Sequence, residues 1–274
     1  MNPLILIRGG GDLASGVILR LHRVGFQIAI LELNKPLAVR RSVCFSEAVY
    51  AGKQTVEGVT ARLVSADQFQ VTMEAGEIPV LIDPNANILR NQFMTNPRNT
   101  FVVDARLLKH EPELLGEEVP LHIGLGPGFR AGENCHAVIE TRRSHTLGRV
   151  YWTGMTQPDS GEPEGDPRRV LRAPSDGVVL GYKKISEHVE AGEEIAIIGE
   201  PNRDQYSIVS PFSGILRGLI RDGLYVTKGM KIGDIDARDD VSACYLVSDK
   251  ALAIGGAVLE AIMSKAEIRK QLFA

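Results

Sequence analysis

The sequence has little of what marks secreted, membrane-spanning or polyanion-binding proteins. Its three cysteines are an odd number, lie far apart and form no CxxC pair, which argues against a disulfide framework or structural zinc and fits a reducing cytosol. Apolar runs such as Leu4–Ile7 are far too short to span a bilayer, and there is no signal-peptide pattern at the N-terminus. Acidic residues outnumber basic ones, 34 to 31, so no basic field would attract nucleic acid or anionic membranes. We therefore expect a cytoplasmic globular protein with no nucleic-acid or membrane partner.

The first part of the chain alternates strands and helices. Continuous apolar runs indicate strands that are buried on both faces, and an amphipathic helix from about Asp12 to Arg23 follows the first of them. This alternation predicts an α/β fold with a Rossmann-like parallel sheet. The predicted ligand-binding domain covers residues 1–165 and includes a glycine-rich β extension. Its predicted strands are Leu4–Ile7, Ile28–Leu31, Val80–Ile82 and Phe101–Val103.

A glycine loop joins the first predicted strand to the first predicted helix and fits the pattern GxGxxA. In such a loop the glycines let the backbone approach a pyrophosphate, and the helix N-terminus supplies N–H groups. The string resembles the GGGDSA loop of thioredoxin-reductase-type NADPH domains. Glu32 ends the next strand about 20 residues on, where an acid hydrogen-bonds ribose hydroxyls. The alternative is a tight turn in which an aspartate caps the helix and fills the anion site itself. The residues predicted to hold phosphate are Gly9, Gly10, Gly11, Asp12 and Ala14.

Further predicted ligand contacts lie just past the strands. Arg40 and Arg41 could bind a ribose phosphate or another anionic group bidentately, or could be part of a solvated loop. Asp104 ends its strand, and ligands of open α/β sheets bind beyond the carboxyl ends of the strands. Asp83 also ends a strand, but the turn pattern Pro84–Asn85 follows it. Asp104 is therefore the favoured site residue of the two.

A second glycine-rich segment, residues 124–128, is followed by polar side chains. Its three glycines and one proline indicate a backbone path with unusual dihedral angles, which often means close approach to a ligand. In a strand over residues 137–141, the side chains of positions 136 and 140 share one face and Cys135 lies on the other. This arrangement weakens both a nucleophile–base pair and a metal site, and no catalytic residue is assigned. The predicted ligand-binding residues here are Gly126, Gly128, His136, Glu140 and His145.

Residues 166–240 contain an internal repeat. Pro174 and Pro211 each precede a glycine by three positions, and the two copies are offset by 37 residues. Matched glycines at equal intervals indicate two similar β-units that pack together. The pattern resembles the two halves of a biotinyl/lipoyl-type barrel-sandwich domain. The joining segment 199–206 holds no lysine, so we expect neither biotin nor lipoate on this domain.

The last segment, residues 241–274, is predicted to be helical. Ser248 supplies the N-cap of a helix whose apolar face includes Leu252 and Ile262. Gly255–Gly256 in the middle of this helix lowers its stability and therefore indicates close packing against another element. We expect the segment to pack on the first domain, because an open parallel sheet needs helices on both faces.

Several strings together resemble one family over nearly the whole chain. They are Ile7–Gly16, Pro36–Arg41, Phe45–Val49, Val103–Arg106, Gly124–Phe129, Val138–Thr141 and Ser248–Gly256. The sequence resembles YqeB-type proteins of selenium-dependent molybdenum-hydroxylase systems, which are related in theme to XdhC/CoxI-type maturation factors. The family usually reads Arg-Gly-His where this chain has Arg143, Ser144 and His145.

That resemblance implies an accessory protein in the maturation of a molybdenum-cofactor hydroxylase. It would bind a nucleotide or a phosphate-bearing pterin at the loop GGGDLA, so the expected cofactor is a dinucleotide, NAD(P), or the molybdenum-pterin cofactor. The expected partners are the molybdenum hydroxylase or its maturation machinery, and we also expect a homo-oligomer. One alternative is an NAD(P)-dependent oxidoreductase, although no set of hydride-transfer residues lies near the loop. Another is a scaffold whose glycine loop is purely structural.

Overall fold

The computed structural model describes residues 3–91, 94–116, 118–161, 165–199 and 204–272. The chain forms two compact units, each built from separate stretches of sequence. The first unit comprises Met1–Pro36, Phe45–Ser160 and Val247–Ala274, and the second comprises Leu37–Cys44 and Gly161–Leu246. The short segment Leu37–Cys44 therefore belongs with chain that follows much later in the sequence.

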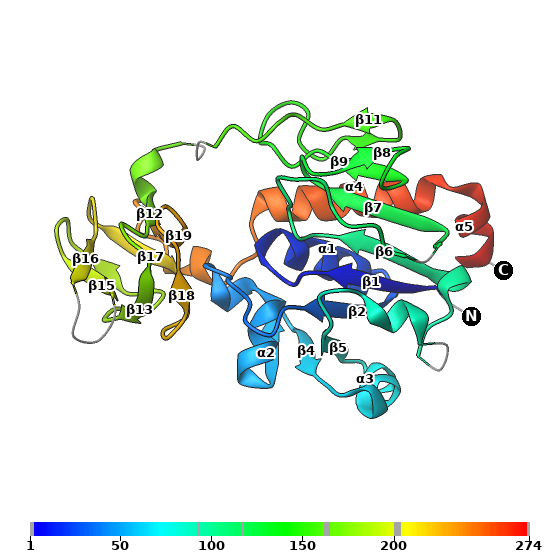
Figure 1. The fold of residues 1–274 in the computed structure, drawn as a ribbon, viewed down its shortest axis with the longest axis horizontal. Helices are drawn as coiled ribbons and strands as arrows, with labels where there is room; N and C mark the ends of the chain where they lie inside the picture. The colour runs from blue at the N-terminus through cyan, green and yellow to red at the C-terminus, as the bar shows by residue number, and fades with distance from the viewer. Residues whose placement is uncertain (1–2, 92–93, 117, 162–164, 200–203, 273–274) are drawn as a thin grey trace. The chain divides into compact units, whose positions relative to one another are not determined.

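One nine-stranded sheet runs through the first unit (Figure 1). Neighbouring strands are parallel from β9 to β4, and the two outermost pairs, β10–β9 and β3–β4, are antiparallel. The central strands β1 and β6 are buried along their whole length, as expected of strands covered on both faces. In spatial order the strands are β10 (Val150–Tyr151), β9 (Ala137–Ile139), β7 (Leu121–Leu125), β6 (Thr100–Asp104), β1 (Leu4–Arg8), β2 (Gln27–Glu32), β5 (Ile78–Ile82), β4 (Val59–Leu63) and β3 (Lys53–Val56).

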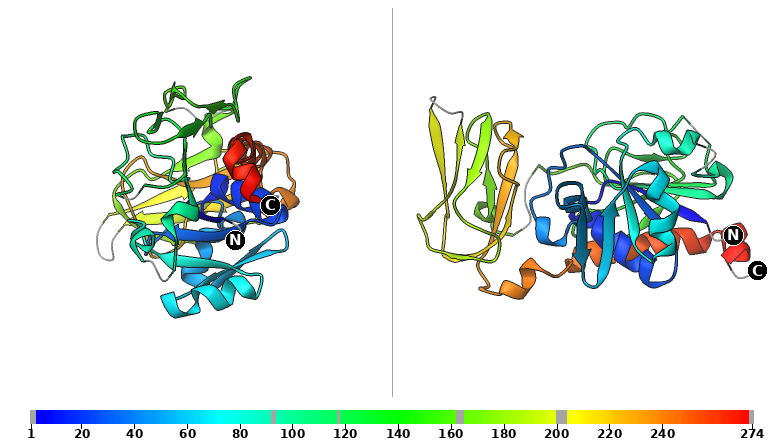
Figure 2. Two further views of the ribbon diagram at one scale, coloured as in Figure 1. Left: turned by 90° about the vertical axis from the view of Figure 1, so that its right-hand side faces the viewer. Right: turned by 90° about the horizontal axis from the view of Figure 1, so that it is seen from below.

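Two helices of the first unit, α1 (Asp12–Arg23) and α4 (Asp249–Ser264), pack against each other (Figures 1 and 2). Glycines face this contact from both sides. A Cβ on Gly16 would overlap the carbonyl group of Ala251, and a Cβ on Gly255 would overlap that of Gly16. The two helix backbones can approach this closely only because these positions carry no side chain.

Alternate side chains of β1 enter a buried hydrophobic cluster. Leu4 and Leu6 join a buried cluster with Phe69 of α3 (Phe69–Glu74) and Val102 of β6. Since side chains alternate along a strand, Arg8 points to the same face as Leu4 and Leu6. The remaining elements of this unit are α2 (Ala48–Ala51), α5 (Ala266–Leu272) and a small sheet of β8 (Arg130–Ala131) and β11 (Gly154–Met155).

The second unit contains two antiparallel sheets of four strands each. Strand β14 from the first copy of the repeat pairs with β17 of the second copy, and β18 from the second copy pairs with β13 of the first. Each copy therefore contributes a short strand to a sheet formed largely by the other. In spatial order one sheet is β12 (Val170–Arg172), β19 (Lys231–Asp236), β17 (Gly214–Leu219) and β14 (His188–Val189), and the other is β16 (Gln205–Val209), β15 (Glu194–Gly199), β13 (Gly177–Gly181) and β18 (Tyr225–Val226).

The predicted fold class is wrong in both of its parts. The expected Rossmann-like parallel sheet is a mixed sheet, because the hairpin β3–β4 and the pair β10–β9 add antiparallel strands at its edges. The expected barrel-sandwich domain is instead a pair of separate antiparallel sheets. Strand–helix alternation and matched turn glycines predict local connections. They do not specify which strand pairs with which sheet edge.

The segment 199–206, which joins the two copies of the repeat and is expected to carry neither biotin nor lipoate, is described only in part. Its residues 200–203 lie outside the described residues. Across the part of the chain that the structure describes, no helix is both long enough and apolar enough to span a membrane.

Candidate functional site

The glycine loop Gly9–Gly11 connects β1 to α1, and its three residues have different surroundings. Gly9 has a φ of +92°, a left-handed conformation that favours glycine. The Gly10 carbonyl accepts a hydrogen bond from the Ser46 N–H at 2.9 Å, and a Cβ on Gly10 would stand 2.8 Å from that nitrogen. At Gly11, no heavy atom of the described residues lies within 4 Å of an added Cβ. Of the three glycines, Gly11 alone leaves space beside the loop.

Glu32, at the end of β2, holds the loop through its carboxylate. Its Oε1 accepts a hydrogen bond from the Gly10 N–H at 2.5 Å, and its Oε2 accepts one from the Leu33 N–H at 2.8 Å. Glu32 is 6% exposed, and this burial raises its pKa against the lowering effect of the two backbone hydrogen bonds. The carboxylate that the sequence predicts to bind ribose is therefore engaged with the protein's own backbone.

Helix α1 begins without a side-chain cap at its N-cap residue, which is Gly11. Asp12 is the acidic residue of the first turn, and Ala14 is buried. The Ser15 hydroxyl donates to the Gly11 carbonyl at 3.0 Å and accepts from the Phe45 N–H at 3.3 Å. These contacts hold the segment after β2 against the loop and the start of α1.

A buried network of charges lies at the carboxyl ends of β1 and β6. Arg8 and Asp104 are opposite each other in the register of the two strands and form an ion pair, Nη1 to Oδ2, at 3.1 Å. Arg106 donates to both oxygens of Asp104, at 2.9 and 2.7 Å. Glu113 Oε1 accepts from Arg8 at 2.5 Å and from Arg106 at 2.6 Å, and the Pro84 carbonyl accepts from Arg8 at 2.8 Å. The two guanidinium groups and two carboxylates balance in formal charge.

The network is buried at one end and open at the other. Arg8 and Asp104 have side chains 2% and 0% exposed, whereas those of Arg106 and Glu113 are 21% and 52% exposed. Partial burial would raise the pKa of Glu113, but the hydrogen bonds from Arg106 and Arg8 outweigh it and lower the pKa to about 2. Burial would likewise lower the pKa of Arg106, but contacts with Asp104 and Glu113 raise it. The Arg106 Cγ lies 3.7 Å from the position of a Cβ on Gly9, so the exposed end of the network borders the glycine loop.

The second glycine-rich segment, residues 124–128, is packed against the protein itself. A Cβ on Gly124 would overlap the ring of Phe129, and a Cβ on Gly128 would overlap the backbone of Leu108. Gly126 has a φ of +88° and therefore has a conformation that favours glycine. The sequence predicts close approach of a ligand to this segment. The atoms that approach it closely in the structure are instead those of the protein's own residues.

Two histidines and one cysteine lie near this segment. His136 Nδ1 accepts a hydrogen bond from the His122 N–H at 2.9 Å, and the rings of His122 and Phe129 meet edge to face. His122 is 5% exposed, its Nε2 has no hydrogen-bond partner among the described residues, and burial lowers its pKa to about 4. Burial raises the pKa of Cys135 to about 11. At neutral pH this imidazole is therefore neutral and this thiol is protonated, so Cys135 is not an activated nucleophile.

Glu140 is fully buried, and its carboxylate binds backbone groups. Oε1 accepts from the Arg142 N–H at 2.7 Å and Oε2 from the Gln157 N–H at 2.9 Å. His145 and His136 are both exposed. Among the described contacts, none joins Glu140 to either histidine, so Glu140 serves to hold its loop.

Arg40 and Arg41 belong to the second unit and bind carbonyl groups there. Arg40 donates to the carbonyls of Ala243 and Leu246, each at 2.9 Å, and Arg41 donates to that of Leu219 at 2.7 Å. These hydrogen bonds hold the segment 37–44 within the second unit. No local feature of the sequence indicates this role.

The structure therefore joins Asp104 to three residues that the sequence analysis did not select, Arg8, Arg106 and Glu113. A local signal existed for two of them. Arg8 is a charge that ends an otherwise apolar strand, and Arg106 follows Asp104 by two positions. Glu113 carries no such signal. Among the described residues, no group of three or more His, Cys, Asp or Glu side chains could hold a metal ion.

Comparison of sequences supports the resemblance to YqeB. The chain is 46% identical over 268 residues to the uncharacterized protein YqeB of Escherichia coli (strain K12). The matched region covers 96% of this chain and 48% of that protein, so the chain spans about half the length of this relative. No protein-family model matches the chain.

Comparison of structures finds remote likenesses. An aspartoacylase family protein from Mesorhizobium loti is 10% identical, with 85% of this chain and 84% of that one covered and a TM-score of 0.25. A succinylglutamate desuccinylase/aspartoacylase from Rhodobacter sphaeroides is 11% identical, with 85% of each chain covered and a TM-score of 0.25. The ectoine utilization protein EutE (DoeB) from Ruegeria pomeroyi is 10% identical, with 85% and 86% covered and a TM-score of 0.26. Such TM-scores are too low to transfer a fold or an activity.

The expected function is not borne out. The three names describe aspartoacylases, succinylglutamate desuccinylases and an ectoine utilization protein, and none of the three describes a molybdenum-hydroxylase maturation factor or an NAD(P)-dependent oxidoreductase. The expected maturation role is withdrawn, together with its molybdenum and selenium link and the oxidoreductase alternative. A short glycine motif and family resemblance had carried that expectation, and neither specifies a partner.

Proposed function

We propose that the first unit binds a small phosphate-bearing ligand, with a phosphate group at the N-terminus of α1 beside Gly11. The observation that carries this proposal is the difference among the three loop glycines. Gly9 and Gly10 face the protein, whereas the space beside Gly11 is open. A phosphate that approaches from this side would meet the loop backbone at the position where a Cβ on Gly11 has no described atom within 4 Å.

The N-terminus of α1 offers the interactions that a phosphate needs. The first N–H groups of a helix have no partner within the helix, and the helix dipole places partial positive charge there. Because the N-cap is Gly11, no side chain at that position competes for these groups. Phosphate binding at a helix N-terminus that follows a glycine-rich turn is a recurring arrangement.

The position of the loop in the sheet supports the same proposal. β1 has β2 on one side, followed by β5, and β6 on the other, followed by β7. Strands that follow β1 in the sequence are therefore added first on one side of β1 (β2 and β5) and later on its other side (β6 and β7). Ligands of open α/β sheets bind outside the carboxyl ends of strands at such a switch point. The glycine loop lies there.

Arg106 supplies a cation at the edge of the proposed site. Its side chain is partly exposed and lies next to Gly9. In the structure its guanidinium group pairs with Asp104 and Glu113. Glu113 is the more exposed of these carboxylates, so a bound phosphate would compete with Glu113 for Arg106.

A thermal-shift series on the full chain tests this proposal. The probes are ADP, NADPH, inorganic phosphate and adenosine, which lacks phosphate. A ligand at about 100 times its Kd stabilises the folded state by about 2.7 kcal/mol, so we expect a clear rise in melting temperature with ADP or NADPH and none with adenosine. Equal shifts with ADP and adenosine, or none with any phosphate-bearing probe, would contradict the proposal.

A further inference from the structure

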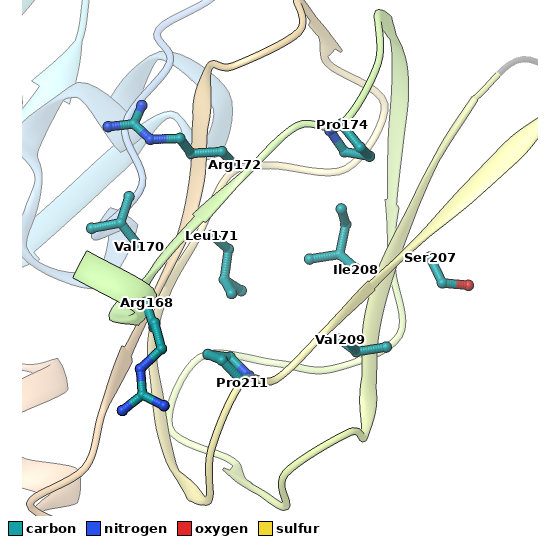
Figure 3. A pocket seen from close by; sticks show the side chains of 9 residues that line it. All are labelled: Arg168, Val170, Leu171, Arg172, Pro174, Ser207, Ile208, Val209 and Pro211. Atoms are coloured by element: carbon teal, nitrogen blue, oxygen red, sulfur yellow. The ribbon is translucent and has the colours of Figure 1, made fainter. Parts of the chain in front are cut away.

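The second unit has a groove of about 360 Å³ between strands β12 and β16. Figure 3 shows Leu171 of β12 and Ile208 of β16 on its two sides, with Pro174 and Pro211 at its ends. Leu171 and Ile208 are each 6% exposed, whereas Val209, which also lines the groove, is 46% exposed. The groove therefore has nearly buried apolar side chains at its sides and is open to water at Val209.

Both strands beside the groove are edge strands. Among the described strands, β12 pairs with β19 alone and β16 pairs with β15 alone. Each thus has one side of its backbone without a strand partner, and such an edge can accept an extended segment of another chain. Strand β16 carries no proline and no charged residue, and β12 carries one charged residue, Arg172.

The side chains of β12 define what an added strand would meet. Leu171 points into the groove, and Val170 and Arg172 point to the other side of the strand (Figure 3). Arg172 donates a hydrogen bond to the Gly229 carbonyl at 2.9 Å, which leaves its positive charge in place. Arg168, which also lines the groove, forms an exposed ion pair with Asp166. Along β12, the apolar Leu171 therefore lies on the groove side, and the cationic Arg172 lies on the opposite side together with Val170.

We infer that this groove binds an extended segment of a partner protein in which apolar and acidic residues alternate. The segment adds as a strand along β12. Since successive side chains of a strand point to opposite faces, its apolar side chains enter the groove beside Leu171 and Ile208, and its acidic side chains lie beside Arg172. The unpaired backbone provides affinity, and the arrangement of apolar and cationic faces provides specificity.

Fluorescence anisotropy with the full chain tests this inference. The probes are two short labelled peptides, one alternating valine and glutamate and the other alternating valine and lysine. We expect saturable binding of the glutamate peptide that weakens with salt, and at least ~10-fold weaker binding of the lysine peptide. Arg172→Glu should reverse this preference, and circular dichroism would verify that the variant is folded. A reversal requires the charge at position 172 to face the bound peptide.

A matched pair of variants tests the position of the peptide. Val209→Asp places a carboxylate at the groove, and Leu180→Asp places one on β13 of the same sheet, where Leu180 is 51% exposed but does not line the groove. We expect only Val209→Asp to weaken binding, by ~10-fold. Equal effects of the two variants, equal binding of both peptides, or no saturable binding up to ~1 mM peptide would overturn the inference. So would a dimer of the chain, seen by sedimentation, that Val209→Asp dissociates.

Discussion

The two glycine-rich segments of the first unit, Gly9–Gly11 and residues 124–128, look alike in sequence but have different surroundings. In the second segment the space that a Cβ would need at Gly124 and Gly128 is taken by the ring of Phe129 and by backbone atoms. In the first, Gly10 is packed in the same way, but Gly11 faces open space. Glycine richness therefore indicates close approach, and the structure is needed to show what approaches.

The charges beside the two segments differ as well. The network of Arg8, Asp104, Arg106 and Glu113 borders the first segment, and its ion pairs favour ionised groups. Beside the second segment, burial favours the neutral form of His122. The first segment thus lies beside a charge-balanced network of ionised groups, and the second lies in surroundings that favour neutral side chains.

The largest effect is expected from breaking the network beside the first segment. Asp104→Ala removes the fully buried carboxylate that pairs with Arg8 and leaves Arg8, whose side chain is 2% exposed, with Glu113 as its remaining carboxylate partner. Breaking a buried ion pair costs about 3–5 kcal/mol. The free energy of unfolding in urea measures this loss. Glu113→Gln is the matched control, because the Glu113 side chain is 52% exposed and exposed pairs contribute at most about 1 kcal/mol. Similar losses in both variants would contradict this account of the network.

The next prediction concerns the packing of the glycines. Gly124→Ala would force the ring of Phe129 to move, and overpacking of this kind costs about 1–3 kcal/mol. Gly11→Ala introduces the same methyl group into open space, so its effect on unfolding should stay within about 0.5 kcal/mol. Equal losses of stability in the two alanine variants would remove the distinction between the segments.

The stability of the protein should depend on pH in different ranges because of His122, beside the second segment, and Glu113, in the network beside the first. His122 has a pKa of about 4 in the folded protein, below its ordinary value of 6.5, so its contribution is present above pH 6.5 and is lost as the pH falls towards 4. The expected slope is about 1 kcal/mol per pH unit in that window, and His122→Gln should remove it. Glu113, lowered from 4.5 to about 2, loses its contribution only between those lower values. Unfolding curves from pH 7 to 4 that are identical in wild type and His122→Gln would contradict the burial of a neutral His122.

A smaller effect is expected on ligand affinity. Glu113→Gln removes a negative charge that competes for Arg106, so phosphate-bearing probes should bind several-fold more tightly, corresponding to about 1 kcal/mol, the interaction of two unit charges about 4 Å apart in water. Calorimetry with ADP measures this change. Glu118, an acid nearby in sequence that forms no described contact with Arg106, provides the control as Glu118→Gln. A weaker affinity in Glu113→Gln would mean that Glu113 helps to bind the ligand.

Local sequence predicted the elements of the first unit well. The apolar run Leu4–Ile7 lies in β1, and the predicted N-cap of α4 is confirmed, since the Ser248 hydroxyl accepts a hydrogen bond from the Ala251 N–H at 3.2 Å. Propensity and periodicity act over a few residues, so such features can be read from the sequence. The same local patterns did not reveal the antiparallel strands at the sheet edges.

The candidate site was harder to predict because its contacts join distant residues. Arg8 meets Asp104 only because β1 and β6 are neighbours in register. Glu32 binds the Gly10 N–H because β2 ends beside the loop, and this use of its carboxylate has no local signature. Arg40 was predicted to bind phosphate, but its carbonyl partners come from the opposite end of the chain. Pairing of this kind is decided by the tertiary fold.

The most direct test of the central claim compares binding and stability in one variant, Gly11→Val. A side chain at Gly11 would stand between the phosphate and the N–H groups of α1, and its Cβ would have no described atom within 4 Å. Gly256→Ala, also in open space, is the control. Using the probe that stabilises the wild type, calorimetry should show binding to Gly256→Ala and none to a folded Gly11→Val protein with near-normal unfolding. Unchanged affinity in folded Gly11→Val would contradict a phosphate site at Gly11.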